Sequence, residues 1–310
     1  MTPRGETAHP NVLVNVARLL RLPDWAKNLF VFAPLVFSGQ LLNARAVWMV
    51  TVVCGALCAA SSSVYIVNDL LDMAPDRAHP TKRLRPLACG AISPMSAGVM
   101  AACLLLLSYA CLAAVEAPVL TWGLVSTFLL INAMYSLYLK RKVIVDVLTI
   151  AIGYVLRVLI GGAAVGVMVS HWLLLCTFLL ATFLGFSKRR HELMVLGPDA
   201  KRHRWVLHLY SESFLDHASL LTLATTLTCY LLYTIAPETV RRFGTDALIY
   251  SGLIVIFGLF RYLFLIHVKK MGSPVEVLYY DRQIVLAVTS WVLYVVCVVY
   301  TWPAMRGLMP

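Results

Sequence analysis

The chain has 310 residues, of which 60% are hydrophobic and 13% are charged, and its formal net charge is +11. A typical soluble domain carries about a quarter charged residues, so this composition excludes a single soluble domain and places the chain in a lipid bilayer. The positive charge does not indicate nucleic acid as a partner, because loops rich in Lys and Arg are its commoner source in a membrane protein. We therefore expect an all-α, polytopic membrane protein.

The first segment, residues 1–23, is expected to differ from the rest of the chain. Over residues 12–28 apolar side chains alternate with four charged ones, Arg18, Arg21, Asp24 and Lys27. This pattern is typical of an amphipathic helix that lies in the membrane interface. Residues 24–310 are predicted to form a single transmembrane domain.

Nine apolar segments are close to the roughly 20 residues that a helix needs to cross a bilayer. They fall near residues 24–42, 44–71, 93–115, 117–138, 143–166, 171–189, 214–236, 246–268 and 283–303. Lys and Arg gather in alternate connections, which predicts that the N-terminus and the loop after the second span face the cytoplasm.

The second predicted span runs directly into Asn68 and three carboxylates, Asp69, Asp72 and Asp76. On a helix Asn68 and Asp72 lie one turn apart, and so do Asp69 and Asp72. Pro75 disfavours helix at the residue before it, so we expect the helix to end there and Asp76 to lie in the loop beyond. Clustered carboxylates with an amide oxygen suit a hard divalent ion, most naturally Mg2+. These four residues are the candidate metal ligands, and the three aspartates are the candidate catalytic residues.

Cations lie close to this acidic segment. Lys82, Arg83 and Arg85 follow it, and would hold the phosphates of a diphosphate substrate at the membrane surface. Tyr135 and Lys140 lie at the end of the fourth span. Each group also has an ordinary explanation, because such residues set membrane topology, contact anionic head groups and anchor helices at the interface.

Two further spans carry charge. Arg157 lies about halfway along the fifth span, where a charged side chain should face a cavity or a partner. A structural ion pair is the alternative explanation for it. At the end of the sixth span, Lys188 and Arg189 share a helix face with Glu192. This segment offers cations for phosphate and one carboxylate for a sugar hydroxyl or a second metal.

The pattern Asn68-Asp69-x-x-Asp72-x-x-x-Asp76, followed by Arg85-Pro86-Leu87 and Gly90 on a nine-span chain, resembles the UbiA superfamily of intramembrane prenyltransferases. The resemblance implies nine transmembrane helices around a central cavity that opens to lipid, with Mg2+ and diphosphate at its cytoplasmic rim. Members usually carry a second Asp-rich motif at the end of the sixth span. This chain has Lys188-Arg189-Arg190-His191-Glu192 there, with one acid.

Three segments are most similar to the branch of the superfamily that transfers phosphoribose: His79-Pro80-Thr81-Lys82-Arg83-x-Arg85-Pro86, Tyr135-Ser136 with Leu139-Lys140, and Lys188-Arg189-Arg190-x-Glu192-Leu193. The resemblance implies phosphoribosyl diphosphate as donor, a polyprenyl phosphate of the decaprenyl phosphate type as acceptor, Mg2+ as cofactor, and a role in arabinan-type precursors of the bacterial cell envelope. It implies the bacterial inner (plasma) membrane and its lipids as the setting. The substrate phosphates and ribose would be bound by Asn68, Lys82, Arg83, Arg85, Tyr135, Lys140, Arg157, Lys188, Arg189 and Glu192.

Two other hypotheses stay open. A conventional UbiA-type prenyltransferase would move a prenyl chain from its diphosphate to an aromatic acceptor, and the missing second Asp-rich motif argues against it. A transporter for an anionic lipid would carry its charges near the bilayer midplane, whereas most charges here lie near the predicted cytoplasmic rim. The sequence leaves the oligomeric state open, a homo-oligomer included.

Overall fold

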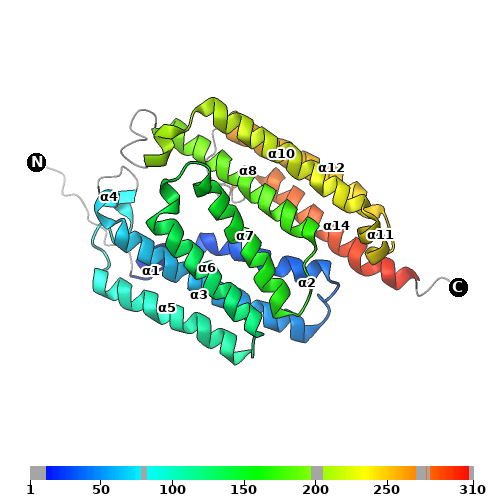
Figure 1. Ribbon diagram of the computed structural model, residues 1–310, viewed down its shortest axis with the longest axis horizontal. Helices are drawn as coiled ribbons and strands as arrows, with labels where there is room; N and C mark the ends of the chain where they lie inside the picture. The colour runs from blue at the N-terminus through cyan, green and yellow to red at the C-terminus, as the bar shows by residue number, and fades with distance from the viewer. Residues whose placement is uncertain (1–11, 78–81, 197–204, 270–276, 278–279, 307–310) are drawn as a thin grey trace, which may run out of the picture. The chain divides into compact units, whose positions relative to one another are not determined.

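The computed structural model describes residues 12–77, 82–196, 205–269, 277 and 280–306 (Figure 1). Throughout these ranges the regular secondary structure is helical and no strand is present. The chain divides into two compact units, which are described separately. The first unit is Met1–Asn28 with Cys54–Glu116, and the second is Leu29–Val53 with Ala117–Pro310. The single transmembrane domain expected for residues 24–310 stays a prediction.

Eight helices among the described residues are long and apolar enough to cross a membrane. They are α3 (Ala44–Leu71), α5 (Pro94–Ala114), α6 (Val119–Leu137), α7 (Val145–Ala164), α8 (His171–Leu196), α10 (Glu212–Ile235), α12 (Ser251–His267) with the preceding 3-10 turn η6 (Ala247–Tyr250), and α14 (Arg282–Arg306). They correspond to the second to ninth predicted spans. Shorter elements connect them: η2 (Lys82–Leu84), η3 (Leu139–Arg141), η5 (Trp205–Leu209) and α11 (Pro237–Phe243).

The first predicted span, near residues 24–42, is not one continuous helix. A 3-10 helix, η1 (Leu22–Phe32), leads into a short α-helix, α2 (Ala33–Phe37). Pro34 lies in the first turn of α2, where its missing N–H group costs no helical hydrogen bond. A ninth span therefore stays a prediction.

In the first unit, α1 (Val12–Leu20) and the part of α3 from Cys54 onward contribute to one apolar core with α5. Its buried members are Leu19, Ile66, Leu87, Ala97 and Ala101. The hydroxyl of Ser63 donates to the carbonyl of Ala101 over 2.8 Å. Small side chains, Ser63 on α3 and Ala97 and Ala101 on α5, thus allow these two helices to pack closely.

The expectation that Asp76 lies in a loop is wrong. After α3 the backbone continues into a short helix, α4 (Met73–Arg77), which contains both Pro75 and Asp76. The N–H group of Asp72 donates to the Asn68 carbonyl, and that of Asp76 donates to the Asp72 carbonyl, each over 2.9 Å. The proline removes one N–H group but does not end the helical path. Asp69 and Asp76 are therefore two turns apart, with Asp72 between them on the same face.

In the second unit, α7 packs against α2, α6 and α8, and α8 packs along α10 (Figure 1). α12 packs against α10 and α14. The approach of η1 to α7 is very close, because a Cβ atom at Gly161 would lie 1.9 Å from the carbonyl oxygen of Val31. Only glycine fits at that point of α7.

Candidate active site

The acidic segment of the first unit is held by two arginines. Arg85 Nη1 donates to Asp69 Oδ1 over 2.9 Å and to Asp76 Oδ2 over 2.6 Å, so one nitrogen bridges two carboxylates. Arg21 Nη2 donates to the same Asp69 oxygen over 2.5 Å. The two aspartates are only 3% and 4% exposed. Buried carboxylates require such partners, because an unpaired charge in this setting is very costly.

The position of Arg21 follows from the contacts around it. Trp25 Nε1 donates to the Ser62 hydroxyl over 3.0 Å, and that hydroxyl donates to the Leu20 carbonyl over 2.8 Å. Arg21 itself has φ of 53°, an uncommon conformation for a residue other than glycine. Its guanidinium group lies 4.8 Å from the centre of the Tyr65 ring. The end of α1 is therefore fastened to α3 so that Arg21 faces Asp69.

The donor set of this segment fits Mg2+ in kind. Three carboxylates and the Asn68 amide lie within two helical turns, and Asn68 Nδ2 donates to Asp72 Oδ2 over 3.2 Å. Nevertheless, no three His, Cys, Asp or Glu side chains in the described ranges converge as metal ligands. Arg85 explains this, because its guanidinium group occupies the place between Asp69 and Asp76 where a cation would bind both.

A second charged cluster lies in the second unit, around Arg189 of α8. Arg189 Nε donates to Asp146 Oδ2 over 2.7 Å, and Nη1 donates to Glu192 Oε2 over 2.6 Å. Nη2 donates to the hydroxyl of Tyr135 over 3.3 Å. Arg189 and Asp146 are both buried. The shared face of Arg189 and Glu192 predicted from their spacing is confirmed.

Asp146 is anchored in turn by the segment that follows η5. The Tyr210 hydroxyl donates to Asp146 Oδ1 over 2.8 Å and accepts from the backbone N–H group of Ile144 over 2.6 Å. Burial, followed by the charge of Asp146, raises the pKa of the Tyr210 hydroxyl, so it remains a donor. Ile144 has φ of 67°, which is strained for a β-branched residue. Through Asp146, the start of α7 is thus joined both to Arg189 of α8 and to Tyr210.

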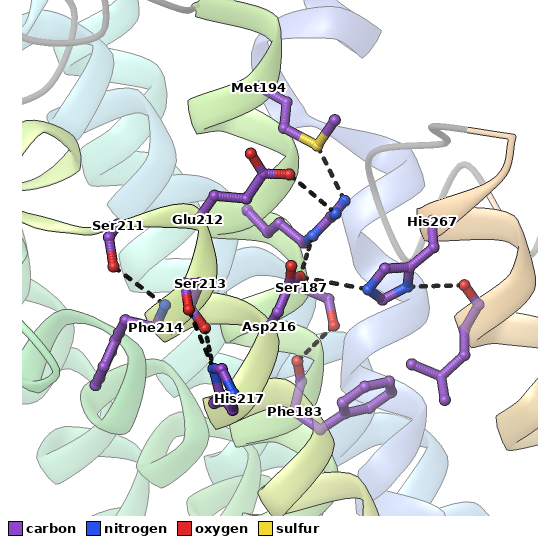
Figure 2. Close-up of polar contacts among 12 residues, drawn as sticks. Phe183, Ser187, Met194, Ser211, Glu212, Ser213, Phe214, Asp216, His217 and His267 are labelled. Carbon is purple, nitrogen blue, oxygen red and sulfur yellow. Dashed lines mark hydrogen bonds and ion pairs between the residues drawn. The ribbon is translucent and has the colours of Figure 1, made fainter.

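Arg190, the next residue of α8, belongs to a different cluster. Figure 2 labels Glu212, Asp216 and His267 of this cluster. Its Nε donates to Asp216 Oδ1, and its Nη2 donates to Glu212 Oε1 over 3.1 Å. His267 Nε2 lies 3.3 Å from the same Asp216 oxygen. The contacts join α8, α10 and α12. Of the three consecutive cations on α8, Arg189 and Arg190 are thus each bound by two carboxylates, whereas Lys188 is exposed.

Arg157 is buried in the middle of α7. Its Nη1 donates to the Gly153 carbonyl over 2.8 Å, and its guanidinium group lies 4.7 Å from the Phe128 ring centre and 5.3 Å from that of Tyr154. Aromatic faces and a backbone carbonyl partly compensate such a charge.

The structure brings the predicted site residues together in two groups. Asn68 with Asp72, and Asp69 with Asp76 and Arg85, form one group; Tyr135, Arg189 and Glu192 form the other. Among the remaining predicted residues, Lys82 and Lys140 are half-buried and Arg83 is exposed. Sequence reasoning missed Arg21 as a site residue, and Asp146 as the partner of Arg189. A charged residue at the start of an apolar span was the available signal for Asp146.

The sequence of this chain is similar to those of known proteins. The family model for the UbiA prenyltransferase family matches residues 29–278. A protein of Mycolicibacterium smegmatis named decaprenyl-phosphate phosphoribosyltransferase is 29% identical over 305 residues, covering 92% of this chain and 93% of that protein. A protein of Corynebacterium glutamicum with the same name is 26% identical over 298 residues, covering 94% and 89%.

Solved structures share the fold. A UbiA homolog from Archaeoglobus fulgidus, bound to DMAPP and Mg2+, has a TM-score of 0.68 at 20% identity and covers 91% of this chain and 98% of that one. A UbiA homolog from Aeropyrum pernix K1 in its apo form has a TM-score of 0.58 at 15% identity, covering 94% and 98%. Together with the eight apolar helices, this identifies a multi-pass membrane protein.

Proposed function

The chain belongs to the UbiA prenyltransferase family, and we propose that it transfers phosphoribose from phosphoribosyl diphosphate to a polyprenyl phosphate, releasing diphosphate. The two relatives named decaprenyl-phosphate phosphoribosyltransferase support this acceptor and donor, because each match covers at least 89% of both chains. The product would serve as a lipid-linked precursor of arabinan-type glycans. The Lys- and Arg-rich connections support a bacterial inner membrane location with the N-terminus and the site in the cytoplasm.

One observation carries the proposal: the end of α8 has a single carboxylate among several cations, and an arginine of the same helix contacts it. Glu192 is the one carboxylate of the segment 188–192, and Arg189 holds it over 2.6 Å. A second acidic metal cluster, of the kind that would hold a prenyl diphosphate, is therefore not built from this segment. A donor with a single metal-bound diphosphate and a separate 5-phosphate needs fewer carboxylates and more cations. This is what the chain supplies.

The acidic segment would bind the leaving group. Asp69, Asp72 and Asp76, with Asn68, would hold Mg2+, which when bound supplies charge stabilisation to the departing diphosphate. Arg21 and Arg85 already contact Asp69, so their guanidinium groups would meet the diphosphate oxygens at that same place. Lys82 and Arg83 follow in sequence and would bind the outer phosphate oxygens.

The second cluster would bind the sugar. We assign the ribose hydroxyl to Glu192 and the 5-phosphate to Lys188, and assign Lys140, Tyr135 and Arg157 to the remaining donor and acceptor phosphates. The role first expected for Arg189, phosphate binding, is revised to positioning Glu192, because Nε, Nη1 and Nη2 all have protein partners. The anomeric carbon would pass through an oxocarbenium-like state. A lipid phosphate is already ionised near neutral pH, so catalysis would consist mainly of positioning and electrostatics.

A paired transfer assay tests the proposal. Purified protein in detergent would receive radiolabelled phosphoribosyl diphosphate with a polyprenyl phosphate, and in parallel a labelled prenyl diphosphate with an aromatic acid. We expect label in the lipid fraction only in the first pairing. Label transfer only in the second pairing would establish the conventional prenyltransferase instead.

A matched pair of variants makes the assay specific. Glu192→Gln removes the carboxylate assigned to ribose. Glu238→Gln removes a carboxylate on α11, which supplies none of the residues described above around Arg85, Arg189 and Arg190. We expect Glu192→Gln to lose most of the turnover and Glu238→Gln to retain it. Equal activity of the two variants would remove Glu192 from the sugar site.

A further inference from the structure

We infer that Arg85 is a built-in counter-cation of the aspartate segment, which a divalent metal displaces only when it arrives together with a diphosphate. The inference rests on the proposed function only in taking a metal diphosphate as the ligand. Its basis is the single nitrogen, Arg85 Nη1, that lies 2.9 Å from Asp69 and 2.6 Å from Asp76. A metal joining these two carboxylates would occupy the same place.

Charge balance explains why the metal alone binds poorly. The two buried carboxylates, Asp69 and Asp76, are matched by two guanidinium groups, those of Arg21 and Arg85. With the half-buried Asp72 included, three carboxylates and two guanidinium groups give a net charge of −1, and a divalent ion that joined them would change it to +1 where solvent screens charge little. The ion must therefore either displace an arginine or bring its own negative charge.

A diphosphate solves both problems. It carries the negative charge that balances the metal, and its oxygens are good acceptors for a displaced guanidinium group. Binding of metal and diphosphate is then mutually reinforcing, and by linkage each raises the affinity of the other by the same factor. Metal without diphosphate would leave Arg85 in place.

Arg85 is the arginine suited to move. Its Nη1 contacts both Asp69 and Asp76, whereas Arg21 contacts Asp69, and the two arginine side chains are similarly exposed, at 27% and 24%. Arg21 has a further contact, since its guanidinium group also lies against the ring of Tyr65, and the carbonyl of the preceding residue, Leu20, accepts from Ser62 of α3. We therefore assign displacement to Arg85 and a fixed position to Arg21.

Equilibrium dialysis of the purified protein in detergent tests this without turnover. Mn2+ serves as the metal probe and inorganic pyrophosphate as the diphosphate probe, and the protein-free chamber gives the free concentration of each. For the unmodified protein we expect pyrophosphate to raise the affinity of the protein for Mn2+ by about tenfold or more. Equal Mn2+ affinity with and without pyrophosphate would overturn the inference even if no variant folded.

Variants assign the effect to one side chain. Arg85→Gln should raise the affinity for Mn2+ alone by about tenfold and reduce the gain from pyrophosphate. Arg85→Lys, which keeps the charge, should bind Mn2+ alone as weakly as the unmodified protein. Arg77→Gln is the matched control, because Arg77 follows Asp76 directly and its guanidinium group donates to the Ala88 carbonyl and the Met73 sulfur. If Arg85→Gln binds Mn2+ alone no better than Arg77→Gln does, Arg85 is not the competing cation.

The outcome is separable from that of the transfer assay. Dialysis uses neither phosphoribosyl diphosphate nor lipid, so a protein with another diphosphate donor would still show the coupling. Conversely, a confirmed phosphoribosyl transfer would stand if the metal bound without pyrophosphate.

Discussion

Arg189 of α8 and Asp146 of α7 form an ion pair in which both side chains are buried, with 2.7 Å between Nε and Oδ2. The remaining nitrogens of the guanidinium group hold Glu192 and Tyr135. The orientation of the proposed sugar-binding carboxylate thus depends on an aspartate that lies 43 residues earlier in the chain.

Loss of one partner of this pair should lower the stability of the protein far more than replacement of both partners by apolar residues. Asp146→Asn leaves a buried guanidinium group with one charged partner fewer, which we expect to cost about 3–5 kcal/mol of stability. The double variant Asp146→Leu with Arg189→Met removes both charges and should recover much of that loss. Thermal unfolding in detergent measures both effects.

Transfer activity then separates stability from positioning. The double variant should fold yet stay poorly active, because Glu192 has lost the group that holds it. If the double variant regained full activity, the pair would serve stability alone. If the double variant were no more stable than Asp146→Asn, the unpaired charge would not be the main cause of the stability loss.

Removing one metal ligand should abolish both turnover and metal dependence. For Asp72→Asn we expect a loss of turnover greater than the about 10–100-fold loss that follows removal of a group hydrogen-bonded to a metal ligand. Asp24→Asn is the control, because Asp24 pairs with Lys27 over 2.5 Å, away from the acidic segment in sequence. Turnover as a function of Mg2+ concentration measures both. An Asp72→Asn protein with unchanged Mg2+ response would contradict the ligand assignment.

Gly161→Ala should disturb the packing of η1 on α7. Its Cβ atom would lie 1.9 Å from the Val31 carbonyl oxygen, a backbone atom that cannot rotate away. We expect a loss of roughly 1–3 kcal/mol, as for other overpacked sites. Gly123→Ala, with nothing within 4 Å of the added atom, should be neutral or slightly stabilising. Similar melting temperatures for the two variants would contradict the close approach.

Stability should also depend on pH through Asp281. Arg261 Nη2 donates to Asp281 Oδ2 over 2.7 Å, and this hydrogen bond holds the pKa of the carboxyl below its usual value. A lowered folded-state pKa stabilises the fold above the unfolded value of about 3.9, and the contribution is lost as the pH falls below it. Asp281→Asn can still accept from the Ile284 N–H group, as Asp281 does over 2.9 Å. The stability difference between the two proteins should therefore shrink as the pH falls below about 4.

Much of the fold was predictable because apolar length is read directly from sequence. The predicted second span, residues 44–71, has the bounds of α3, because the length of the apolar run sets the length of the helix. Proline was the weaker guide. Pro75 predicts a helix end, yet it lies in the first turn of α4, and the helical path continues through Asp76.

The site was predictable only where its partners are close in sequence. Arg189 and Glu192 are three residues apart, so helical periodicity places them together. Arg21 and Asp69 are 48 residues apart and Asp146 and Arg189 are 43 apart. No periodicity connects such pairs. They meet only through packing, by way of Ser62 in one case and Tyr210 in the other.

The conformation and contacts of Arg21 restrict which residues can replace it. Glycine would relax the backbone at φ of 53° but would abandon Asp69, whereas lysine would keep the charge without the planar fork of the guanidinium group. In a library of all substitutions, position 21 should therefore tolerate almost no replacement. The exposed Arg18, one turn earlier, should accept many.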